Sequence, residues 1–152
     1  MASITDILTT VQQGVVAVNN LVVAFNTLVV RLAVGAAAWT SYTPTVTAFA
    51  GTLTTVSATG RYKRVGKTVF FSIVITITTN GTGATAVIAT LPVTASANAI
   101  NTAFVGREDA VTGKLLIGWA ATTTQVFIQN YDGTYPGFDG AILGVSGSYE
   151  SA

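Results

Sequence analysis

Residues 67–79 read KTVFFSIVITITT, and this stretch decides the class of the fold. Every second position in it is large and apolar: Val69, Phe71, Ile73, Ile75 and Ile77. A period of two places alternate side chains on one face of a β-strand, and β-branched and aromatic residues suit strands. The stretch therefore predicts a strand that buries one face in a core.

Shorter segments of similar character lie on both sides of this strand. Asn80-Gly81 predicts a hairpin from 67–79 into residues 84–91, because both turn residues tolerate a positive φ. Many short strands with Gly or Asn turns favour an antiparallel β-sandwich of the jelly-roll type over residues 39–152. The other predicted strands are 43–49, 52–58, 60–66, 98–105, 114–121, 124–130 and 141–149, the last with Leu143, Val145, Gly147 and Tyr149 on one face.

The N-terminal segment, residues 1–32, repeats every seven residues instead of every two. Its lines are TDILTTV (5–11), QQGVVAV (12–18), NNLVVAF (19–25) and NTLVVRL (26–32), each beginning with two polar residues and ending with an apolar one. A strict period of seven predicts a helix that forms a coiled-coil stem, and the wide apolar stripe favours three or more strands. The predicted oligomerisation residues are Ile4, Ile7, Val11, Val18, Leu21, Phe25, Leu28 and Leu32. Residues 33–38, AVGAAA, are the predicted linker.

A membrane span is the alternative for this helix. Residues 7–30 carry no formal charge and are long enough to cross a bilayer. However, amides recur along one face, and a lipid-facing row of amides is costly. We therefore favour the stem and keep a membrane-anchored β-domain protein as the less favoured reading. The N-terminus also lacks the basic region of a secretory signal, so synthesis in the cytoplasm without a signal peptide is expected.

Composition excludes several kinds of chemistry. The 152 residues contain no Cys and no His, which removes disulfides, thiolate zinc sites, Cys nucleophiles and histidine bases. Only 9% of the residues are charged and the net charge is +1, which argues against a nucleic-acid partner. We expect Glu108, Asp109, Asp132 and Asp139 to be exposed turn residues rather than catalytic carboxylates or metal ligands. The sequence thus predicts no enzyme activity, no metal and no cofactor.

Two segments are candidates for contact with a partner. Residues 129–140, QNYDGTYPGFDG, combine aromatic rings with amides and carboxylates, which suits sugars and protein interfaces alike; the alternative is that these rings cover the end of the sandwich. The stretch 61–67 holds four of the seven basic residues, and it fits either an acidic glycan or a solvated strand edge. We assign Trp39, Tyr42 and Trp119 to packing at the stem junction and in the core. The candidate contact residues are Asn130, Tyr131, Asp132, Tyr135, Phe138, Asp139, Arg61, Lys63 and Arg64.

The chain resembles short fibre or spike proteins of tailed bacteriophages and prophages. The resemblance covers roughly residues 39–150, and it is carried by WTSYTPTVTAFAGTLTTVSATG (39–60), by GAILGVSGSYES (140–151) and above all by GRYKRVGKTVFFSIVITI (60–77) with its Gly-x-Tyr and Gly-Lys-x-Val spacing. It implies a homotrimer on the outside of a virion head or tail. In that arrangement residues 1–32 dock on capsid, portal, collar or tail proteins, and the β tip attaches to host-surface polysaccharide. A capsid decoration or cement protein is the alternative that the resemblance leaves open.

Overall fold

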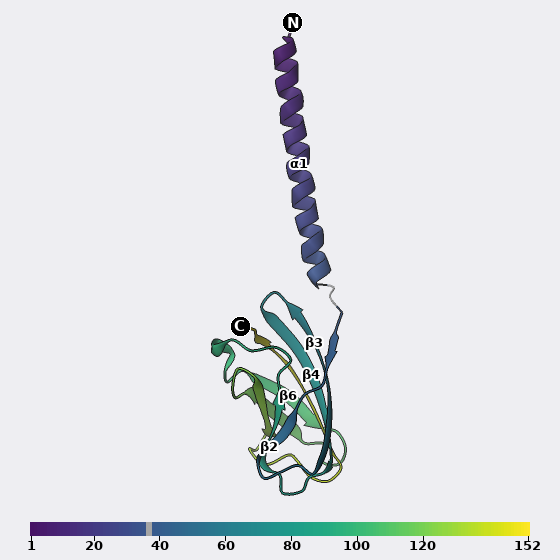
Figure 1. Cartoon of the computed structure of the whole chain (residues 1–152), viewed down its shortest axis with the longest axis vertical. Helices are drawn as coiled ribbons and strands as arrows, with labels where there is room; N and C mark the ends of the chain where they lie inside the picture. The colour runs from purple at the N-terminus through teal and green to yellow at the C-terminus, as the bar shows by residue number, and fades with distance from the viewer. Residues whose placement is uncertain (36–37) are drawn as a thin grey trace. The chain divides into compact units, whose positions relative to one another are not determined.

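The computed structural model describes residues 1–35 and 38–152, with the side chains of residues 31–35 left out of the description. The chain divides into two compact units, Met1–Ala37 and Ala38–Ala152. The first is a single helix, α1 (Ile4–Gly35), and the second contains all of the strands (Figure 1). The predicted N-terminal helix and the mainly β class are therefore confirmed. The helix extends to Gly35, into the predicted linker, of which residues 36 and 37 lie outside the described residues.

A reciprocal pair of hydrogen bonds caps the start of α1. The Ser3 hydroxyl accepts a hydrogen bond from the Asp6 backbone N–H at 3.1 Å, and the Asp6 carboxylate accepts one from the Ser3 N–H at 2.9 Å. These bonds satisfy donors that a helix start leaves without intrahelical partners. The backbone and side-chain hydrogen bonds from Ser3 also lower the pKa of Asp6. The helix start is thus fixed by local chemistry alone.

The second unit is one antiparallel sheet. Its nine strands are hydrogen-bonded in the order β1-β3-β4-β9-β6-β7-β8-β5-β2. A short 3₁₀ helix, η1 (Ala97–Ala99), lies between β5 and β6. The strands are β1 (Thr40–Tyr42), β2 (Val46–Ala50), β3 (Thr55–Val65), β4 (Thr68–Thr79), β5 (Ala84–Thr90), β6 (Ala103–Glu108), β7 (Leu115–Ala120), β8 (Gln125–Asn130) and β9 (Ala141–Glu150).

The sheet is strongly curled. β1 and β2 are its two edge strands, yet only residues 43–45 separate them in the chain. Four Cα–Cα steps span at most about 14 Å, so the two edges must approach one another. Figure 1 shows the resulting curl, with β2 returning toward β3. The predicted jelly-roll sandwich differs from this arrangement, because hydrogen bonding joins every named strand into one sheet.

The inner face of the curled sheet holds the core. Val69, Phe71, Ile73, Ile75 and Ile77 of β4 are all buried, as the period of two predicted. The predicted inward face of β9 is also confirmed. Phe71, Phe104 and Tyr149 pack edge to face at the centre, with the centroids of Phe71 and Phe104 4.8 Å apart. This core belongs to the β unit alone, since it draws on residues from 42 onward.

The predicted hairpin at Asn80-Gly81 is wrong. β4 pairs with β3 on one side and with β9 on the other, whereas β5 pairs with β2 and β8. Both edges of β4 are therefore occupied, and the Asn80–Gly83 turn carries the chain across to the far part of the sheet. The tight hairpin lies before β4 instead, at Gly66-Lys67, where Gly66 has φ +60°.

Several predicted strand boundaries also change. The predicted strand 98–105 begins too early, because η1 (Ala97–Ala99) precedes β6, which starts at Ala103. The predicted strands 52–58 and 60–66 merge into one continuous strand, β3, which begins at Thr55 and runs without a break through residue 59, with Gly60 packed closely against the Tyr42 ring. The predicted strand 43–49 begins too early: Pro44 lies in the connection between β1 and β2, where it needs no ladder hydrogen bond. The contact of Gly60 with Tyr42 is tertiary and is absent from a local pattern, whereas Pro44 is a local signal.

Replacing Tyr42 by phenylalanine is expected to stabilise the protein by about 1 kcal/mol. The Tyr42 hydroxyl is buried and has no hydrogen-bond partner among the described residues, and burial raises the pKa of this phenol far above its ordinary value of 10. Removing the hydroxyl removes the cost of desolvating it, while the ring contact with Gly60 stays. Urea unfolding of the full chain, followed by tryptophan fluorescence, measures the change.

The control is Tyr149→Phe. The Tyr149 hydroxyl donates a hydrogen bond to the Val93 carbonyl at 2.7 Å and accepts one from the Val93 N–H at 3.2 Å. Its loss is expected to destabilise the protein by about 1 kcal/mol or more, because the Val93 groups lose their partner. A Tyr42→Phe variant that unfolds as easily as Tyr149→Phe would contradict the assignment of an unpaired hydroxyl.

Candidate functional site

The apolar stripe of α1 is uncovered within its own unit. The seven predicted oligomerisation residues with described side chains are each more than half exposed, from 54% for Ile7 to 78% for Ile4. Leu32, the eighth, lies in the helix, but its side chain is outside the described residues. The segment Ile4–Val30 is also long and apolar enough to cross a membrane, and none of it is buried. An apolar surface of this extent marks a site of contact with protein or lipid.

The loop after β8 divides the predicted contact residues into two groups. Asn130 is buried, and its side-chain amide donates hydrogen bonds to Thr134 Oγ1 at 2.9 Å and to the Tyr135 carbonyl at 3.0 Å. Tyr135 and Phe138 pack against the core. These three residues shape and seat the loop. Tyr131, by contrast, is 67% exposed.

The two aspartates of this loop have separate structural partners. Asp132 accepts hydrogen bonds from Thr134, which lower the pKa of its carboxyl, and it lies 3.7 Å from the Lys114 ammonium. Asp139 accepts a hydrogen bond from the Asn80 N–H at 2.7 Å, and the Tyr135 hydroxyl donates to Asn80 Oδ1, also at 2.7 Å. The loop is therefore pinned to the turn that follows β4, and the candidate contact surface at this end reduces to the region of Tyr131.

Glu108 is not the exposed turn acid that the sequence predicts. Its side chain is fully buried at the end of β6, where the carboxylate accepts hydrogen bonds from the N–H groups of Ala110, Val111, Thr112 and Ile142. Burial raises the pKa of Glu108, but the backbone hydrogen bonds outweigh it and hold the pKa at about 2, below its ordinary 4.5. The carboxylate thus organises the turn between β6 and β7. Asp109 beside it is exposed, as predicted, and lies 3.6 Å from Arg107.

The three basic candidates on β3 have different environments. Arg61 is exposed, and its guanidinium carbon lies 5.1 Å from the centre of the Trp39 ring. Arg64 donates a hydrogen bond from Nε to the Gly66 carbonyl at 2.9 Å, within its own hairpin. Lys63 is half-buried, two residues beyond Arg61. Strand pairing places Arg61 among polar side chains of the neighbouring strands β1 and β4.

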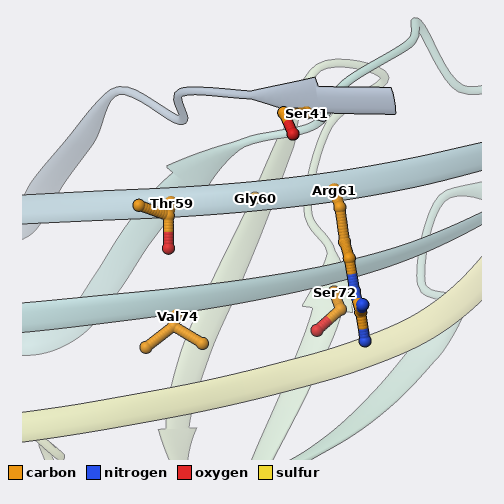
Figure 2. A pocket seen from close by; sticks show the side chains of 6 residues that line it. All are labelled: Ser41, Thr59, Gly60, Arg61, Ser72 and Val74. Carbon is orange, nitrogen blue, oxygen red and sulfur yellow. The ribbon is translucent and has the colours of Figure 1, made fainter. Parts of the chain in front are cut away.

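Those side chains and Arg61 line a groove on the outer face of the sheet. It has a volume of about 330 Å³, and Figure 2 shows its lining side chains, with that of Arg61 extended across the sheet beside Ser72. The pairing of strands explains the cluster, because Arg61 lies opposite Ser41 of β1 and opposite Ser72 of β4. The lining residues are Ser41, Thr59, Gly60, Arg61, Ser72 and Val74.

A cluster of apolar side chains lies on the outer face of β2, β6, β7 and β8. Val105 and Ile117 lie opposite each other on β6 and β7, and Trp119 lies opposite Phe127 on β7 and β8. The Phe127 ring also contacts Phe49 of β2, with centroids 5.3 Å apart. This outer apolar face comprises Phe49, Val105, Leu115, Ile117, Trp119 and Phe127, of which Val105 is 63% exposed.

Sequence reasoning missed this outer apolar face and misplaced Trp119. Trp119 packs on the outer face beside Phe127 rather than in the core, and Trp39 is 46% exposed against Arg61. Tyr42 does pack against the core, as predicted. The signal for the outer face was available, because residues 115–119 are apolar at nearly every position, which is too many for a strand with one solvated face.

Comparisons with protein-family models, with curated proteins and with solved structures found no match to this chain. The function must therefore be argued from the helix, the groove and the outer apolar face.

Proposed function

We propose that the protein is a non-enzymatic, self-associating fibre or spike protein that sits on the outside of a virion. In this proposal, α1 helices of three copies pack along their apolar stripes into a coiled coil, and the β units attach the particle to host-surface glycan. The observation that carries self-association is the uncovered stripe of α1. The virion assignment is supported by the resemblance of residues 39–150 to phage fibre and spike proteins.

The physical argument for self-association begins with the instability of the lone helix. α1 is rich in valine, which is a moderate helix former, and an isolated helix gains little from propensity in water. It becomes stable when its apolar residues are buried against a partner. Copies of the same helix offer a stripe with the same seven-residue spacing, so each can fill the spaces left by another. The polar pairs Gln12-Gln13 and Asn19-Asn20 then face water.

The outer apolar face of the β unit is consistent with the same proposal. Its six residues are uncharged, and Arg107 of β6 borders it opposite Leu115, so the centre of the face offers a second copy no like charge. Once α1 has joined the copies, their β units are held at a high effective concentration, and even a weak contact between them is populated. Tip-to-tip contact would therefore add to the association of the stem.

The test compares Leu21→Glu with Asn20→Glu in the full chain. Both variants place one carboxylate on the same turn of α1, but Leu21 belongs to the apolar stripe and Asn20 to the polar row. The mass in solution, measured by sedimentation equilibrium, is expected to be that of a trimer for the parent chain and for Asn20→Glu. Leu21→Glu is expected to dissociate, because three carboxylates would be buried together without partners.

The same measurement on residues 39–152, which hold a complete core of their own, distinguishes association through α1 from association through the β unit. A monomer assigns trimerisation to α1, whereas a trimer shows that the outer apolar face also associates. A monomeric parent chain would contradict the proposal. Co-flotation of that monomer with phosphatidylcholine vesicles would then favour the membrane-anchored alternative, which the length and apolarity of Ile4–Val30 support.

Particles that lack the protein distinguish the attachment role from the alternative of capsid decoration. Reduced attachment to host cells with unchanged heat resistance of the particle supports the attachment role. Unchanged attachment with reduced heat resistance supports decoration.

A further inference from the structure

We propose that the Arg61 groove on the outer face of β1, β3 and β4 is a binding site for a sugar that carries a carboxylate, such as a uronic acid. The inference rests on the proposed attachment function, and it names the place and the ligand class. It moves the contact site away from the loop 129–140, whose aromatic rings are largely used in packing, to a surface that the strand register builds.

Strand register brings serine and threonine hydroxyls together with the Arg61 guanidinium on one face of the sheet. Ser41, Arg61 and Ser72 form a single cross-strand row, and Ser146 of β9 continues it opposite Ser72. In the next row of the same face, Thr59 lies opposite Val74. Small side chains on adjoining strands leave the surface hollow beneath the longer Arg61 (Figure 2). The hydroxyls can both donate and accept, as the hydroxyl groups of a sugar require.

The cation in this groove is held in position before a ligand arrives. The Arg61 guanidinium carbon lies 5.1 Å from the centre of the Trp39 ring, and this contact restricts the arginine side chain. Figure 2 shows the guanidinium beside Ser72. No carboxylate of the described residues pairs with Arg61. A guanidinium presents two parallel N–H groups that match the two oxygens of a carboxylate. A planar anion, such as a carboxylate, would therefore be the partner that best satisfies the Arg61 guanidinium.

The charge and the volume of the groove limit the class of ligand further. One arginine lines the groove and the whole chain has a net charge of +1. This positive charge is too small for a nucleic acid, whose binding relies on several phosphate contacts. Its volume of about 330 Å³ lies at the low end for ligand sites, which suits one sugar ring at a time. A single acidic ring surrounded by hydroxyl partners satisfies both limits.

The experiment titrates the full chain with hexagalacturonate and with the neutral hexasaccharide maltohexaose, using isothermal calorimetry at about 0.15 M salt, where distant surface charges are screened. Hexagalacturonate is expected to bind and maltohexaose to bind at least about tenfold more weakly. Arg61→Gln is expected to weaken the binding of hexagalacturonate at least about tenfold, because paired hydrogen bonds to a charged group are lost. Arg61→Lys, which keeps the charge without the planar pair of donors, is expected to lie between the parent and Arg61→Gln.

Arg64→Gln is the matched control, because it removes the same charge three residues along the same strand from an arginine whose Nε is bonded within its hairpin. It is expected to change binding by less than about twofold. Equal losses for Arg61→Gln and Arg64→Gln, or equal binding of the two hexasaccharides, would overturn the inference. The mass of each titrated sample is measured in parallel. A trimer that does not bind hexagalacturonate contradicts the proposed binding site but not the proposed self-association. A monomer contradicts the proposed function itself.

Discussion

Replacing Glu108 by alanine is expected to lower the free energy of unfolding by at least about 3 kcal/mol. The buried carboxylate accepts hydrogen bonds from several backbone N–H groups of the turn between β6 and β7 and from Ile142 of β9. Alanine leaves these donors buried without an acceptor. Because the turn and β9 are both tied to this carboxylate, the β6–β7 hairpin should also become more accessible to hydrogen exchange.

The pH dependence of stability provides a second readout for Glu108. Its pKa is about 2 in the folded protein and ordinarily 4.5, so the folded state favours the charged form. This stabilisation is fully present above about pH 4.5 and is lost as the pH falls toward 2. The difference between the two values corresponds to about 3 kcal/mol. Urea midpoints of the parent chain should therefore fall over this range more steeply than those of Glu108→Gln.

Asp109→Asn is the control for both measurements. Asp109 is the neighbouring carboxylate, but it is exposed and its ion pair with Arg107 is 3.6 Å long. Its removal is expected to change stability by less than about 0.5 kcal/mol. If Glu108→Gln were as stable as Asp109→Asn and had the same acid profile as the parent, the buried carboxylate would not have the structural role assigned to it.

Replacing Gly106 by alanine is expected to destabilise the protein by about 2–4 kcal/mol. Gly106 lies in β6 opposite Val145 of β9, at the one pairing that connects β1-β3-β4-β9 to the rest of the described sheet. A methyl group there would collide with the Gly144 carbonyl oxygen and would lie 2.8 Å from Val145 Cγ2. Backbone cannot move aside cheaply, so β6 and β9 must separate. Thermal unfolding measured by circular dichroism tests this expectation.

Gly144→Ala is the matched control on the facing strand. A methyl group at Gly144 would meet only the Asp109 carboxylate at 3.3 Å and the Arg107 carbonyl at 3.8 Å. This side chain can shift, and alanine reduces the freedom of the unfolded chain, so the expected change is within about 0.5 kcal/mol. Equal destabilisation by both variants would show that glycine is needed along this pairing for a reason other than the contact at Gly106.

The sequence by itself determined the local structure of this protein. The period of two in residues 67–79 specified β4 and its buried face, and the heptad pattern specified α1. These features depend on side chains that are neighbours in the chain, or one strand or helical repeat apart. For that reason a single sequence is sufficient to predict them.

Tertiary structure decided which strands meet, and therefore what each surface contains. Asn80-Gly81 has the local chemistry of a hairpin, but β3 and β9 occupy both edges of β4. The residues next to Glu108 in the sequence predict an exposed turn acid. Its carboxylate is buried because the β6–β7 turn and β9 close around it. The row of Ser41, Arg61 and Ser72 joins residues from three strands, and its members meet through register alone. Pairing is a long-range choice, set by burial of the core, and no local pattern encodes it.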